Sequence, residues 1–104
     1  GAKGIRDKGI LESAIKRPFQ TFDGKDLYPG SVDKAAAIFE SIVSNHPFVD
    51  GNKRTAYVLM RLILKRYQLD IEVDQDVKFE FVMKAAKGEL AFDKIKTWIS
   101  NNLK

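Results

Sequence analysis

The stretch from Asn52 to Tyr67 is apolar on almost every side of the helix that its spacing predicts. Ala56 and Met60 recur at helical spacing, while Val58 and Leu62 place apolar side chains on other faces. A helix of this kind is normally the central, buried element of a domain. We therefore expect a bundle of helices packed around this segment.

Four more helices are predicted by the helical spacing of apolar residues and by the capping and breaking residues around them. Asp7 is expected to cap the first helix and Pro18 to stop it, while Pro47 breaks the second and Gly88 ends the fourth. The four predicted ranges are 7–17, 31–45, 74–87 and 92–101. Between the first two helices, Asp23-Gly24 predicts a small β-hairpin. The expected fold is a compact all-α bundle with one hairpin.

Large apolar residues near the end of the chain are expected to pack the core, because aromatic residues at helical spacing usually do. These residues are Phe79, Phe81, Met83 and Trp98. The first helix is expected to bury a stripe of Ile10, Leu11, Ala14 and Ile15.

Length and composition indicate a single domain, residues 1–104, with one modest core. The chain has no cysteine, which excludes disulfides and thiolate zinc sites and fits the reducing cytoplasm. No apolar run approaches the roughly 18 residues of a membrane span, so no membrane partner is expected. The net charge of +4 fits a polyphosphate ligand or an acidic partner. Nucleic acid is disfavoured as a partner because the cations are scattered among acids.

The segment from His46 to Ala56 reads His-Pro-Phe-Val-Asp-Gly-Asn-Lys-Arg-Thr-Ala and holds the only histidine of the chain. Four residues after this histidine comes Asp50, a candidate metal ligand. A base and a carboxylate thus meet at the junction between a loop and a predicted helix. This inventory suits the transfer of part of a nucleotide onto an acceptor hydroxyl.

The first turn of the predicted helix carries two cations, Lys53 and Arg54, at an end where partial positive charge disfavours them. Free N–H groups of this turn, close backbone approach at Gly51 and the two cations together predict an anion site. The alternative interpretation is a solvated start to a core helix, with Asp50 or Asn52 as its N-cap.

The segment resembles the signature of the Fic/Doc family, which reads His-x-Phe-x-acidic-Gly/Ala-Asn, then Gly or Lys, then Arg. AMP-transferases of the Fic type typically read Gly-Asn-Gly-Arg-x-x-Arg. Here Lys53 replaces the second glycine and Tyr57 replaces the last arginine, and both departures resemble the Doc (death-on-curing) branch.

The resemblance covers nearly the whole chain. Gly4-Ile5-Arg6-Asp7 with Leu11-Glu12-Ser13-Ala14 resembles the early helix of Doc-like proteins. Residues 22–29 resemble their hairpin flap, and Lys34-Ala35-Ala36 resembles the helix before the signature. Doc-like proteins usually have another helix before the first of these segments. Because this sequence begins almost at that segment, we expect a Fic/Doc-type bundle whose first family helix is missing. Because that loss would expose part of the core, a homo-oligomer that covers this surface remains one of the expected assemblies.

The resemblance also implies roles for the loop residues. His46 would be the general base and Asp50 would hold Mg²⁺. Backbone N–H groups of Gly51 and Asn52 would bind a phosphate, with Lys53 and Arg54 clamping its oxygens.

By the same resemblance, ATP is the cofactor, and Lys53 reverses the nucleotide so that its γ-phosphate meets the acceptor. The implied target is a threonine hydroxyl of elongation factor Tu, whose modification would block translation. The hairpin flap would align the target, and a cognate antitoxin would restrain the toxin. Two alternatives stay open: a Fic-type protein AMP-transferase, and a catalytically silent module that binds a nucleotide or a partner.

Overall fold

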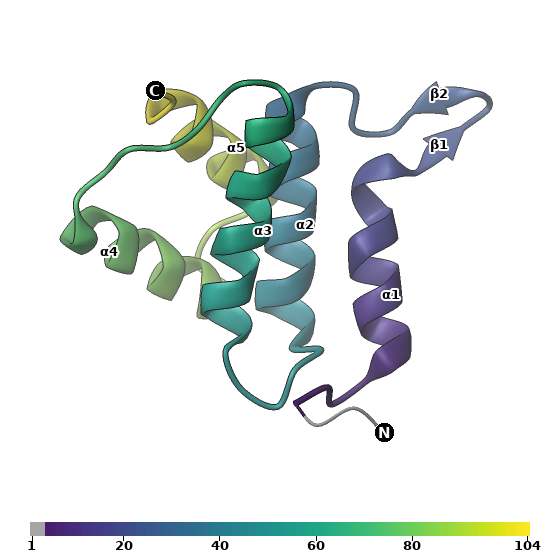
Figure 1. Ribbon diagram of the computed structural model, residues 1–104, viewed down its shortest axis with the longest axis horizontal. Coiled ribbons are helices and arrows are strands. Elements are labelled where there is room, and N and C mark those ends of the chain that lie inside the picture. The colour runs from purple at the N-terminus through teal and green to yellow at the C-terminus, as the bar shows by residue number, and fades with distance from the viewer. Residues whose placement is uncertain (1–3) are drawn as a thin grey trace.

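The computed structural model describes residues 4–104, and this part of the chain folds into five α-helices with one small hairpin (Figure 1). The helices are α1 (Lys8–Lys16), α2 (Ser31–Asn45), α3 (Asn52–Arg66), α4 (Gln75–Ala86) and α5 (Phe92–Asn101). A 3₁₀ turn, η1 (Arg17–Phe19), leads into the strands β1 (Thr21–Phe22) and β2 (Lys25–Asp26). The predicted all-α class, the helix ranges and the hairpin are confirmed. The expected loss of a first family helix falls outside the described residues and stays a prediction.

Side-chain caps explain why helices begin where the sequence predicts. Asp7 Oδ1 accepts the N–H of Ile10 at 3.0 Å at the start of α1, and Asp74 Oδ1 accepts the N–H of Val77 at 2.9 Å at the start of α4. Gly88, with φ at +77°, lies just beyond α4, where a left-handed residue ends a helix.

Helices α2 and α3 form the centre of the bundle, with α1 on one side of α2 and α4 and α5 on the other (Figure 1). Contrary to the sequence expectation, α2 is the more buried of the two: its residues from Lys34 to Phe39 are all buried. In α3, Val58 and Leu62 remain 48% and 51% exposed. The alanines of α2 are small enough to let neighbouring helices approach closely, so its burial exceeds what its apolar content suggests.

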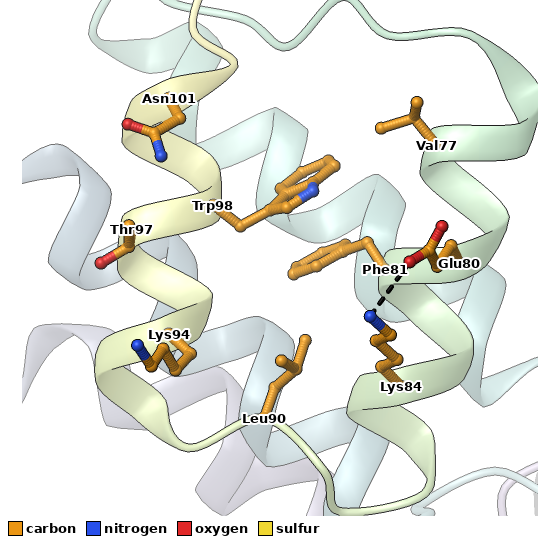
Figure 2. Close-up of a pocket in the computed structure, with 9 residues that line it drawn as sticks. All are labelled: Val77, Glu80, Phe81, Lys84, Leu90, Lys94, Thr97, Trp98 and Asn101. Carbon is orange, nitrogen blue, oxygen red and sulfur yellow. Dashed lines mark ion pairs between the residues drawn. The ribbon is translucent and has the colours of Figure 1, made fainter.

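A stack of three aromatic rings, Phe39, Phe81 and Trp98, ties α2 to α4 and α5. The centroids of Phe39 and Phe81 lie 4.9 Å apart, and those of Phe81 and Trp98 lie 3.8 Å apart with nearly parallel planes. Figure 2 shows the last two rings lying face to face between their helices. The core prediction holds for Phe81, while Met83 and Trp98 are half-buried. It is wrong for Phe79, which is 67% exposed.

The first helix buries less than expected. Ala14 is buried, but Ile15 is 46% exposed. Since α1 packs on α2 from one side only, most of its predicted apolar stripe keeps contact with solvent.

The hairpin turns at Asp23 and Gly24, whose φ values of 54° and 76° match the left-handed turn that this sequence favours. Its base is fixed to α2, because the buried Lys34 donates to the Tyr28 carbonyl and pairs with Asp26 at 3.4 Å. The hairpin precedes α2, whereas His46 follows it, so a 15-residue helix separates them (Figure 1). A helix of that length spans roughly 22 Å. The structure therefore does not place the expected flap beside the histidine loop.

Within residues 4–104, no helix has both the length and the apolar character needed to cross a membrane.

Candidate functional site

The predicted site residues gather at one end of the bundle, in the loop that joins the end of α2 to the start of α3 (Figure 1). His46 is the C-cap of α2 and adopts the left-handed conformation, with φ 50° and ψ 59°. Its own N–H donates to the Ile42 carbonyl at 3.1 Å. The next residue, Pro47, is fully buried and anchors the loop. His46 is exposed to solvent.

A side-chain clamp from Asn52 holds the middle of the loop. Its Oδ1 accepts the Phe48 N–H and its Nδ2 donates to the Phe48 carbonyl, both at 2.9 Å. Phe48 is half-buried and packs against the hydrophobic core, which anchors the loop. The clamp fixes where α3 begins relative to that core contact.

Helix α3 has no side-chain cap, so the N-cap interpretation of Asp50 and Asn52 is wrong. The N-cap is Gly51, whose φ of 77° suits glycine. Asp50 Oδ1 accepts the Gly51 N–H at 2.8 Å, so that N–H, expected to bind phosphate, already has a partner. The helical hydrogen bonds of α3 begin with the Thr55 N–H, leaving the N–H groups of the first turn for a ligand.

A pocket of about 250 Å³ opens between α3 and α4, next to this helix start. Three cations line it: Lys53, Arg54 and, from α4, Lys78. Its other lining residues are Tyr57, Gln75, Phe79, Val82 and Met83. No acid lines the pocket, and none of the three cations forms an ion pair within residues 4–104. The pocket therefore combines unneutralised positive charge with apolar and aromatic walls.

Tyr57 forms part of the buried wall of this pocket. The Lys78 Nζ lies 4.8 Å from the centroid of its ring, a cation–π contact. Burial raises the pKa of the Tyr57 hydroxyl, so it stays neutral at physiological pH. The wall therefore adds no negative charge to oppose an anionic ligand.

Magnesium fits this site only as an ion that arrives with phosphates. Among residues 4–104, no three His, Cys, Asp or Glu side chains cluster in a way that could hold a metal by themselves. Asp50 is exposed and uses one carboxylate oxygen on the Gly51 N–H. Mg²⁺ is commonly bound by one or two carboxylates together with substrate phosphates and water. A single carboxylate beside an anion pocket meets that requirement.

Two residues of this region were not anticipated. Lys78 comes from a separate helix and belongs to no motif, so nothing in the sequence linked it to the loop. Arg6 was noted only as part of a resembling segment, yet its side chain contacts the loop backbone directly.

A larger cavity of about 330 Å³ lies between α4 and α5, beside the Phe81–Trp98 stack (Figure 2). None of the predicted site residues lines it. The candidate site is therefore the cationic pocket and the adjoining histidine loop.

Comparisons with known proteins bear on the same region. Residues 1–64 match the model of the Fic/DOC family, a span of more than half the chain that includes the whole histidine loop. The chain is also 43% identical, over 77 residues, to a protein of Mycolicibacterium smegmatis (strain ATCC 700084 / mc(2)155) named Toxin Doc. That alignment covers 74% of this chain and 59% of the relative, so the chain spans about three fifths of the relative's length.

Proposed function

The chain belongs to the Fic/Doc family, and on that premise we propose that it is a Doc-like toxin that transfers the γ-phosphoryl group of ATP to a protein hydroxyl. The observation that carries this proposal is the pocket beside the histidine loop, in which Lys53, Arg54 and Lys78 face a ligand without any neutralising acid. Such a pocket suits a ligand with several negative charges and an apolar end, which describes a nucleotide.

In the proposed reaction, His46 takes the proton of the acceptor hydroxyl through an imidazole nitrogen. The hydroxyl oxygen forms a bond to the γ-phosphorus, and the bond from that phosphorus to the β,γ-bridging oxygen breaks. The electron pair of the broken bond leaves with ADP. Positioning and charge neutralisation supply most of the acceleration of phosphoryl transfer, so no covalent enzyme intermediate is needed.

The other loop residues hold the nucleotide in this proposal. Arg54 presents a planar fork to the phosphate oxygens and Lys53 a point charge. The free N–H groups of the first turn of α3, beginning with that of Asn52, add donors aligned with the positive end of the helix. Asp50 would hold Mg²⁺, which, when bound, neutralises charge on the phosphates.

The target and partners follow from the family resemblance. We propose a threonine hydroxyl of elongation factor Tu as the acceptor, which would make the modification a block to translation in the cytoplasm. The relative named Toxin Doc supports a toxin role. We propose a cognate antitoxin as the partner that restrains it.

Intact-mass spectrometry of elongation factor Tu, incubated with the protein, ATP and Mg²⁺, tests this function. A phosphate-sized mass gain is expected. A gain the size of a nucleotide monophosphate would replace the proposal with AMP transfer, and no gain in any form of the target would reject the acceptor named here.

The matched control is His46→Asn, because asparagine tolerates the left-handed backbone of this position but offers no base. His46→Ala serves as a second control. Both variants should fold and give no transfer. Wild-type activity in either folded variant would refute the role of His46.

A further inference from the structure

The segment Gly4–Asp7, which precedes α1, runs alongside the histidine loop rather than forming part of a helix. An isolated β-bridge pairs Ile5 with Phe48. Three backbone hydrogen bonds join the segments: Val49 N–H to Gly4 O at 2.8 Å, Arg6 N–H to Pro47 O at 2.7 Å, and Asp7 N–H to Pro47 O at 3.1 Å. The segment therefore pairs with the loop backbone from Pro47 to Val49.

Within this segment, the Arg6 side chain reaches the carbonyls at the end of α2. Its Nε donates to the His46 carbonyl at 2.7 Å, and its Nη2 donates to the Asn45 carbonyl at 2.8 Å. The last carbonyls of a helix have no partner within the helix and carry partial negative charge. A guanidinium fork matches two such acceptors in one plane, and hydrogen bonds from a charged donor are stronger than neutral ones.

One of these two bonds holds the carbonyl of His46, one of the residues other than glycine with a left-handed backbone in residues 4–104. For a residue other than glycine, the left-handed conformation of His46 is uncommon and has to be held by its surroundings. The N–H of His46 is held by Ile42, and its carbonyl is held by Arg6. Since the backbone conformation limits which side-chain rotamers are allowed, fixing this carbonyl restricts the directions in which the imidazole can point.

We propose that Arg6 is a positioning residue that sets the backbone of His46, and thereby the imidazole, for proton transfer. This inference rests on the proposed role of His46 as the base. Arg6 forms no ion pair within residues 4–104, so its charge serves these carbonyls and no carboxylate. It lines neither cavity, including the cationic pocket that would hold the nucleotide.

A structural role and a positioning role predict different kinetics. If Arg6 only stabilised the end of α2, its loss would lower the folded fraction and leave the turnover of the folded protein unchanged. If Arg6 positions His46, kcat per folded molecule falls while the KM for ATP stays constant, because the phosphates are bound by α3 and α4. A small displacement of a reacting group costs up to about 100-fold in rate, and we expect a loss of about 10-fold.

The variants are Arg6→Ala, which removes the fork, and Arg6→Lys, which keeps the charge but not the planar geometry. Arg66→Ala is the matched control, because Arg66 is also exposed but lies at the far end of α3. We expect Arg6→Ala to lower kcat with the KM for ATP unchanged, Arg6→Lys to recover part of the loss, and Arg66→Ala to match wild type.

NMR supplies a readout that needs no enzymatic activity. His46 is the only histidine, so its imidazole signals are assigned without ambiguity. We expect Arg6→Ala to shift and broaden these signals and the His46 amide, while signals from the α2–α3 core stay in place. If Arg6→Ala leaves the His46 signals unchanged, the inference is overturned. The same holds if wild type is active and Arg6→Ala has the same kcat per folded molecule. If wild type transfers nothing to the target, the acceptor named above is rejected, and the NMR comparison alone decides whether Arg6 positions His46.

Discussion

Replacing Asn52 with alanine should destabilise the protein through the loss of the loop clamp. The change removes both 2.9 Å hydrogen bonds between the Asn52 amide and the Phe48 backbone, in a part-buried setting. A hydrogen bond of this kind contributes about 0.5–1.5 kcal/mol net, so the pair contributes about 2 kcal/mol. For a domain near 100 residues, each kcal/mol shifts Tm by about 4–8 °C, which predicts a decrease of about 8–16 °C.

Urea and thermal unfolding followed by circular dichroism measure this loss. Asn52→Asp is an informative companion, because its carboxylate still accepts the Phe48 N–H but cannot donate to the Phe48 carbonyl. It should therefore lose less stability than the alanine variant, helped by a negative charge at the start of α3. Asn101→Ala is the control: Asn101 is an exposed residue at the end of α5.

An Asn52→Ala variant with the stability of Asn101→Ala would refute the clamp. Transferase activity adds a second criterion, because the clamp fixes the start of α3 relative to His46. Activity per folded molecule should fall in Asn52→Ala. Full activity would show that the loop keeps its geometry without the amide.

Three further predictions concern the pocket, the loop and the connection to α4. Lys78→Ala should weaken ATP binding by roughly 10-fold, as measured by calorimetry, through the loss of a charge-assisted contact, with a smaller effect at high salt. Gly51→Ala should cost about 1–2 kcal/mol in urea unfolding, because alanine strains at the φ of 77° found here. A hydrogen bond from Arg61 lowers the pKa of Asp70 well below its usual range. Because that folded-state pKa is depressed, the pair's stabilisation is present at neutral pH and lost as the pH falls below about 4. Asp70→Asn should therefore lower stability at pH 7 and flatten its decline in acid, as followed by urea unfolding across pH.

Helix boundaries could be predicted from the sequence because local chemistry sets them. Asp7 and Asp74 accept N–H groups of the helices they precede, and Gly88 supplies the left-handed residue that ends α4. These interactions span three or four residues, so the sequence contains both partners of each. The hairpin turn at Asp23-Gly24 was predictable for the same reason.

Burial was harder to predict because it depends on which neighbours each helix meets. Phe79 and Phe81 are two residues apart on α4 and so point to nearly opposite sides, and only Phe81 meets Phe39 and Trp98. Both are aromatic, and the pattern within α4 does not distinguish the covered side from the exposed one. For a similar reason, the sequence did not predict that α2 would be more buried than α3, since alanines contribute little to an apolar pattern.

The residues of the candidate site likewise fall into those that local sequence predicts and those that depend on tertiary packing. Residues from His46 to Arg54 are contiguous, so their chemistry could be read directly, and the structure brings them to one end of the bundle. Lys78 lines the pocket from α4. Arg6 lies just before α1 and contacts the loop with its side chain. Their contributions depend on tertiary packing that no local spacing encodes.

The histidine loop combines an exposed side chain, His46, with a backbone that is held in place. An acceptor on a folded protein can reach His46 only if the imidazole lies at the surface, and surface loops are usually the mobile part of a structure. Here the backbone of the loop is held by Arg6 at His46, by the burial of Pro47 and by Asn52 at Phe48, while the imidazole stays at the surface. Because the hairpin lies at the opposite end of α2, the proposed function leaves alignment of the acceptor to surfaces around this loop and the cationic pocket. A hairpin variant such as Phe22→Ala should consequently leave the KM for the protein target unchanged. A rise in that KM would instead show that the target spans the length of α2.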